Sequence, residues 1–165
     1  MSSMTIKQAR RQLLRLVPEP CDLDTFVQRA ASKRGRPIRV LDVDFSAEGG
    51  ITGAWKPTPQ RDLIFVASSA TGILRVAIVC HEISHIWLNH LPEDLGFVGQ
   101  EGLETVLPSL LEASPELASK FVRFRHDYGS EAEADAEYLA TTLMSAIGSS
   151  AAQGRAQHVA SSLLW

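Results

Sequence analysis

The apolar positions near the N-terminus recur at helical spacing, which predicts two helices within about residues 5–35. The first should end before Pro18, and the second should begin at Asp22 or Asp24 and end near Gly35. Residues 37–67 then change to the composition of a β meander, with strands expected at 38–43, 51–55 and 63–67. Prolines within 56–62 predict a hairpin loop between the last two strands.

Helical periodicity returns over about residues 69–89, in a helix that Ser68, Ser69 or Thr71 can cap. A helical C-terminal part is expected over about 100–165, with helices around 103–111, 115–124, 131–147 and 153–164. Ser130 and Glu133 form a capping-box start for the third of these, and the segment 148–150 should end it. The order predicts one α+β domain over 1–165, in which a short, mostly antiparallel sheet packs against the 69–89 helix.

The composition is that of an ordinary globular chain, with 45% hydrophobic and 21% charged residues. A net charge of −3 gives no electrostatic reason to expect nucleic acid or an anionic membrane as a direct partner. No stretch has the roughly 20 apolar residues that a membrane span needs. Two cysteines, Cys21 and Cys80, are too few for a disulfide framework, so the composition suits a reducing compartment.

The 69–89 helix carries the sequence His81-Glu82-Ile83-Ser84-His85. Two histidines four residues apart lie on one helical face, so both can bind one zinc ion. Zinc lowers the pKa of bound water to about 7, and the intervening Glu82 is placed to take a proton as water attacks a carbonyl. The motif therefore predicts a zinc-dependent hydrolase with Glu82 as the catalytic base.

A third metal ligand is expected from the acidic segment that begins the 131–147 helix. Glu131 and Glu133 are about 200° apart around a regular helix, so only one of them can face the metal. Glu131 is favoured, because Asp135 then lies one turn later on the same face and can accept a hydrogen bond from a ligand histidine. An acidic helix N-terminus without any metal is the alternative explanation of this segment.

Several other residues have simpler explanations than catalysis. On a regular helix His90 points away from His85, as a histidine near the helix C-terminus. His126 and Tyr128 could reach an oxyanion, but a surface turn is the favoured explanation and they are left out of the catalytic set. Cys80 is rotated about 100° from the neighbouring histidine and is expected in the core.

With these two motifs the chain resembles the ImmA/IrrE family of bacterial and phage metallopeptidases. The similarity covers roughly residues 38–144 and is carried by HEISHIWLNH at 81–90 and EAEADAEYLATTLM at 131–144. Asp135 stands where the family usually has asparagine. The resemblance implies a zincin-like minidomain of the gluzincin type and a cytoplasmic protease that cleaves a helix-turn-helix transcriptional repressor.

The leading hypothesis is thus a regulatory zinc endopeptidase, with one Zn²⁺ per chain and a protein or peptide substrate. The alternative is a non-catalytic zinc-binding regulator, or a toxin-like component, that acts by binding a partner repressor. The two hypotheses differ in whether function requires Glu82.

Overall fold

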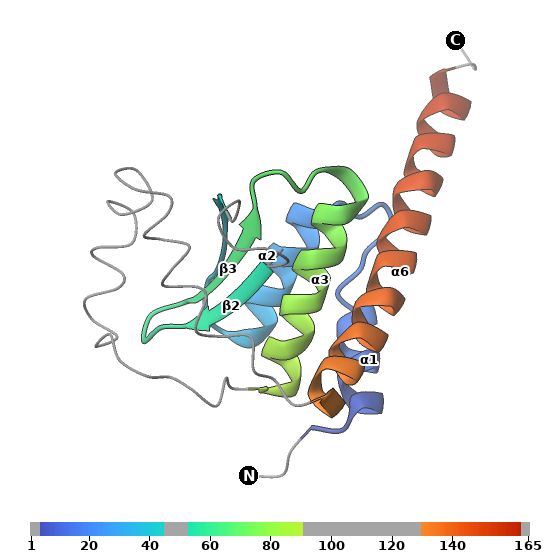
Figure 1. Ribbon diagram of the computed structural model, residues 1–165. Helices are drawn as coiled ribbons and strands as arrows, with labels where there is room; N and C mark the ends of the chain where they lie inside the picture. The colour runs from blue at the N-terminus through green and yellow to red at the C-terminus, as the bar shows by residue number, and fades with distance from the viewer. Residues whose placement is uncertain (1–3, 45–52, 91–129, 163–165) are drawn as a thin grey trace.

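The computed structural model describes residues 4–44, 53–90 and 130–162. Within these ranges the protein has four helices and one three-stranded mixed sheet, an α+β architecture as the sequence predicts (Figure 1). The helices expected at 103–111 and 115–124 lie outside the described residues.

The two N-terminal helices begin and end at their sequence signals. Helix α1 (Ile6–Leu14) starts with a capping box between Thr5 and Gln8. Helix α2 (Leu23–Arg34) has Asp22 as its N-cap, whose side chain accepts a hydrogen bond from the Thr25 backbone at 2.7 Å. It ends at Gly35, whose φ of 74° lies in the left-handed region that glycine adopts without steric cost.

The sheet has the strand order β1-β3-β2, which differs from the predicted meander. Strand β1 (Ile38–Val43) pairs in parallel with β3 (Asp62–Ala67), and β2 (Gly53–Pro57) pairs antiparallel with β3. The expectation of a mostly antiparallel sheet is therefore wrong for the β1–β3 pair. Every residue of β3 is buried, and this suits the central position of that strand.

Helix α3 (Gly72–Leu88) lies between the sheet and helix α6 (Ser130–Ser162) (Figure 1). From Ile78 to Leu88 every side chain of α3 except that of His81 is buried. The apolar side chains that α6 contributes recur at helical spacing: Ala136, Leu139, Ala140, Leu143 and Ile147. The second half of α3 is thus the centre of the core.

Helix α6 is continuous through the segment that was expected to end it. Gly148 and the two serines after it remain helical, so the separate helices predicted at 131–147 and 153–164 are one. A glycine inside a helix costs only about 1 kcal/mol relative to alanine, and the segment contains no proline, so nothing in it forces a break. Among the described residues, no helix has the length and apolar character needed to span a membrane.

A buried carboxylate ties the sheet to α2. Asp62 is fully buried at the start of β3 and lies 2.5 Å from Nε of Arg34 and 3.4 Å from Nε of Arg36. The indole Nε1 of Trp55 donates a third contact to it, at 3.1 Å. These donors neutralise and solvate the carboxylate in place of water.

Candidate metal centre

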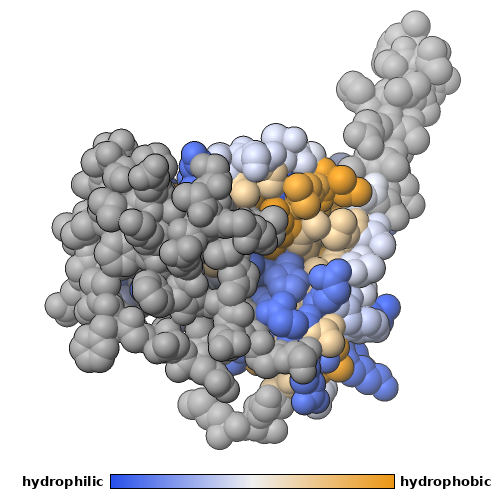
Figure 2. All heavy atoms as spheres, in the orientation of Figure 1, coloured by the Kyte–Doolittle hydropathy of each residue, from blue (hydrophilic) through white to orange (hydrophobic). Residues whose placement is uncertain are grey.

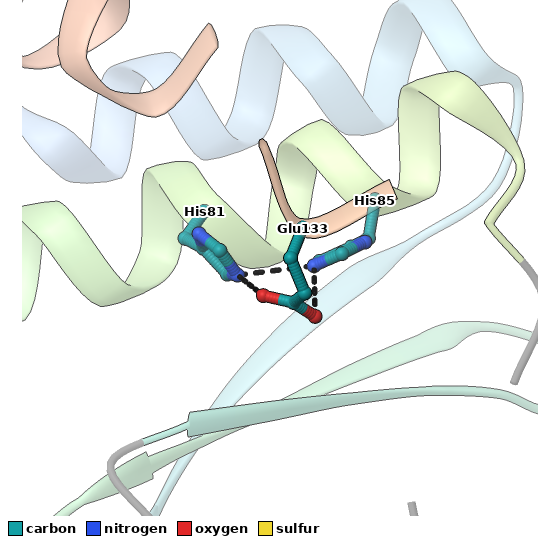
Figure 3. A group of neighbouring side chains, drawn as sticks. All are labelled: His81, His85 and Glu133. Carbon is teal, nitrogen blue, oxygen red and sulfur yellow. Dashed lines mark hydrogen bonds and ion pairs between the residues drawn. The ribbon is translucent and has the colours of Figure 1, made fainter. Parts of the chain in front are cut away.

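Helix α3 brings the two motif histidines together as their spacing predicts. The Nε2 atoms of His81 and His85 lie 3.0 Å apart, and the ring planes are inclined by 74° (Figure 3). His85 is fully buried, whereas the side chain of His81 is 22% exposed. Two ring nitrogens at this distance cannot both present lone pairs unless a proton or a cation lies between them.

Helix α6 places a carboxylate against both nitrogens. Oε2 of Glu133 is 3.3 Å from Nε2 of His81, and Oε1 is 3.5 Å from Nε2 of His85. The three side chains converge from two helices that are far apart in the sequence (Figure 3). Each offers one ligand atom to a common point.

The spacing of these atoms fits a metal ion. Zinc binds nitrogen at about 2.0–2.1 Å and oxygen at about 2.0–2.2 Å, so tetrahedral ligand atoms lie about 3.4 Å from one another. The two Nε2 atoms are 3.0 Å apart, and Glu133 approaches them to 3.3 and 3.5 Å through its two different oxygens. One ligand atom from each of the three side chains lies within 4.8 Å of the other two, so a small movement of the side chains would bring them to the zinc separations. Imidazole and carboxylate are also ligands that zinc accepts.

The glutamate beside the histidines is Glu133, not the favoured Glu131. Glu131 is exposed and lies outside the group, whereas Glu133 is partly buried against α3. The sequence predicted a ligand at Glu131 and a supporting acid one turn later at Asp135. The structure has the same spacing two residues further along, where Glu133 and Glu137 both lie against His81. The preference for Glu131 rested on Asp135, whereas the observed phase of α6 turns Glu133 toward the histidines.

The Nδ1 atoms of the two histidines also have neighbours. Nδ1 of His85 lies 3.1 Å from Nδ1 of His90. Nδ1 of His81 lies 3.5 Å from Oε2 of Glu137, a long contact to a carboxylate that is 73% exposed. The His90 contact is therefore the stronger of the two.

The expectation that His90 points away from His85 is wrong, because the helix does not continue to it. Helix α3 ends at Leu88, and Asn89 has φ 55° and ψ 40°, which turns the chain back. The signal in the sequence was Asn89, since asparagine is common at left-handed helix ends. Glu137 was equally missed, although it lies four residues after Glu133.

Asp135 acts on His90 through its charge. Burial lowers the pKa of His90, and the charges of Asp135 and Glu133 oppose this shift without cancelling it. His90 is consequently held toward its neutral form, which can accept a hydrogen bond at one ring nitrogen.

Glu82 lines a pocket of about 320 Å³ that it shares with His81 and Glu133. Its side chain is only 4% exposed. Gly53 of β2 lies against it, because a Cβ atom at that position would be 3.1 Å from Oε1 of Glu82. The start of β2, helix α3 and the first turns of α6 thus form the walls of the pocket.

The mouth of this pocket is partly apolar. Leu74 lines it and is 50% exposed, and the neighbouring Ile73 is 77% exposed. Figure 2 shows apolar surface next to strongly hydrophilic surface on this face of the molecule. The pocket therefore offers both polar groups and apolar contact to a ligand.

Cys80 lies in the core, as predicted, although it is adjacent to His81 in the sequence. It is fully buried, and desolvation raises the pKa of its thiol to about 12. A thiol in this state is neither a reactive nucleophile nor a ready metal ligand. His126 and Tyr128, the candidate oxyanion stabilisers, lie outside the described residues.

Comparison of the chain with protein-family models, with characterised proteins and with solved structures gave no match in any of the three.

Proposed function

We propose that the protein is a zinc-dependent peptidase in which His81, His85 and Glu133 hold the metal and Glu82 transfers protons. The observation that carries the proposal is the convergence of three ligand atoms beside the pocket that Glu82 lines. Three protein ligands with a position left for water or substrate are the usual arrangement of catalytic zinc, whereas structural zinc has four. Zinc, when bound, supplies Lewis acidity that polarises a carbonyl and makes water more acidic.

Glu82 has the surroundings that a proton-transfer group needs. Its carboxylate is withdrawn from bulk solvent and lies in the wall of the pocket, next to the ligand His81 in the sequence. In the proposed reaction it accepts a proton from the attacking water and passes it to the leaving amine. Low exposure keeps competing water away from that carboxylate.

The sheet supports a peptide as the substrate. Strand β2 is at one edge of the three described strands, and Gly53 at its start lines the pocket. An extended peptide can add to such an edge through main-chain hydrogen bonds, which would pass its carbonyl groups near the histidines. The zincin-like fold and a helix-turn-helix repressor as the substrate are proposed from the resemblance of the two motifs.

The proposal is tested first by zinc content per chain, measured by elemental analysis on protein purified without a histidine tag. We expect one zinc per chain, lost in His85→Ala and strongly reduced in Glu133→Gln. Glu131→Gln is the matched control on the same helix and should retain zinc. The opposite result for the two glutamates would restore the ligand predicted from the sequence, and absence of zinc in every protein would end the proposal.

The same panel then separates a peptidase from a binding protein. Glu82→Gln should retain zinc and lose about 10²–10⁴-fold in cleavage of the substrate protein, because a proton-transfer group contributes about that factor. Helix-turn-helix proteins encoded next to this chain are the substrates to assay. If Glu82→Gln retains full function, the protein acts by binding its partner, as the alternative hypothesis holds.

A further inference from the structure

We propose that His90 is a positioning residue: its Nδ1 accepts a hydrogen bond from Nδ1–H of His85 and so fixes the tautomer in which Nε2 of His85 faces His81 and Glu133 without a hydrogen. The role of this hydrogen bond in metal binding rests on the proposed function. The geometry of the bond rests on α3 and the turn at Asn89 that follows it, and does not depend on which glutamate of α6 is the third ligand.

The contact has the dimensions of a hydrogen bond between rings. The two Nδ1 atoms are 3.1 Å apart, and the ring centroids are 5.3 Å apart with the planes inclined by 64°. Since a nitrogen pair at this distance shares one hydrogen, either His85 or His90 must donate. His85 is fully buried, so bulk water cannot replace this interaction.

The direction of the bond follows from what lies on the other side of the His85 ring. Its Nε2 faces Nε2 of His81 at 3.0 Å and Oε1 of Glu133 at 3.5 Å. A neutral imidazole carries one hydrogen, and a ligand nitrogen must carry none. The hydrogen therefore belongs on Nδ1, from which His85 donates to His90.

The backbone supports the position of His90. Asn89, in the left-handed conformation, directs the chain so that the backbone N–H of His90 donates to the carbonyl of His85 at 3.0 Å. The backbone of His90 is thereby tied to the same residue that its side chain contacts. Asparagine adopts this conformation more easily than most residues, so the turn is built into the sequence.

The tautomer can be measured directly by ¹⁵N chemical shifts of the histidine rings in metal-free protein. The wild type should show His85 with its hydrogen on Nδ1. His90→Asn is the conservative variant, because the amide oxygen takes roughly the place of Nδ1 and can accept the same hydrogen bond. His90→Leu fills similar space without an acceptor, so His85 should shift toward the Nε2–H tautomer.

Zinc affinity provides the second readout. His90→Leu should bind zinc about 10–100-fold more weakly than the wild type, the usual effect of losing a group that orients a ligand histidine. His90→Asn should recover most of that loss. Thermal unfolding of both variants shows whether any change comes from a damaged fold.

An Nε2–H tautomer in the wild type, or an unchanged His85 tautomer in folded His90→Leu, would overturn the inference. So would equal loss of zinc affinity in the asparagine and leucine variants. If the leucine variant does not fold, the tautomer of the wild type alone decides. Failure of the wild type to bind zinc would instead remove the proposed function, and the metal-free ¹⁵N spectra would still test the role of His90.

Discussion

Two buried carboxylates, Asp62 on β3 and Glu82 on α3, have nearly the same low exposure and very different surroundings. Asp62 is 0% exposed and is surrounded by two guanidinium groups and an indole N–H. Glu82 is 4% exposed and lies in a pocket wall beside a histidine and another glutamate.

The difference teaches that burial alone does not identify a functional acid. A carboxylate that binds fixed cationic donors has a structural role, since moving it would leave those donors unpaired. A carboxylate in the wall of an open pocket, near candidate metal ligands, can exchange a proton with a bound molecule. Asp62 should therefore matter to stability and Glu82 to chemistry.

The largest effect that tests this comparison is expected from Asp62→Asn. The amide can keep the contact to Trp55 but removes the negative charge between Arg34 and Arg36. Loss of one partner of a buried ion pair costs about 3–5 kcal/mol, and we expect about 2–4 kcal/mol here because both arginine side chains are partly exposed. Urea unfolding measures this loss.

Glu82→Gln is the matched isosteric variant, and it should change the free energy of unfolding by less than about 1 kcal/mol. The same urea experiment on both proteins decides the comparison. If Glu82→Gln destabilised the protein more than Asp62→Asn, the roles assigned to the two carboxylates would be reversed.

An intermediate effect is expected from Gly53→Ala. The new Cβ would lie 2.3 Å from Cγ2 of Ile78 and 3.1 Å from Oε1 of Glu82, so both must move. Overpacking of this kind costs about 1–3 kcal/mol, and the displaced Glu82 should reduce catalysis while zinc content is retained. Chemical denaturation, metal analysis and the cleavage assay report these three quantities.

Gly148→Ala is the control for that substitution. Nothing lies within 4 Å of a Cβ at position 148, and the residue is inside α6. Alanine there should stabilise the protein by about 0.5–1 kcal/mol. Full activity in Gly53→Ala would show that Glu82 tolerates displacement and would weaken its proposed role.

The smallest effect is expected from Arg36→Met. Nε of Arg36 is 3.4 Å from Asp62, compared with 2.5 Å for Arg34, and its side chain is 29% exposed. Its removal should cost about 1 kcal/mol or less, and Arg34→Met should cost more. Neither should change zinc content. A larger loss for Arg36→Met would mean that the contacts of Arg36, which include a hydrogen bond donated to the carbonyl of Thr58, stabilise the fold more than those of Arg34.

Local signals allowed most of the elements and the histidine pair to be predicted from the sequence. Asp22 and Gly35 marked the ends of α2, and the spacing of His81 and His85 placed both rings on one face. Each of these inferences needs only the geometry of one helix. The functional roles of these residues remain predictions.

The failures all required information from outside one element. The parallel pairing of β1 with β3 depends on which strand becomes central, and single-strand composition does not contain that information. The choice between Glu131 and Glu133 depends on how α6 is rotated against α3. The direction of the His90 side chain was predicted for a regular helix that continues to residue 90. Asn89 adopts the left-handed conformation and ends the helix before it, so that prediction failed.

The packing of α6 on α3 also has a consequence for how the chain folds. Glu133 lies about fifty residues after the histidine pair, and closing a loop of that length costs roughly 3–4 kcal/mol of chain entropy. The apolar residues of α6, Leu139, Leu143 and Ile147 among them, bury surface against the core and offset this cost. In the unfolded chain only the two histidines, which are four residues apart, stay close together. The group of His81, His85 and Glu133 therefore forms only when α6 packs on α3. A ligand that needs all three side chains would therefore bind the native state preferentially and raise the free energy of unfolding in proportion to the logarithm of its concentration.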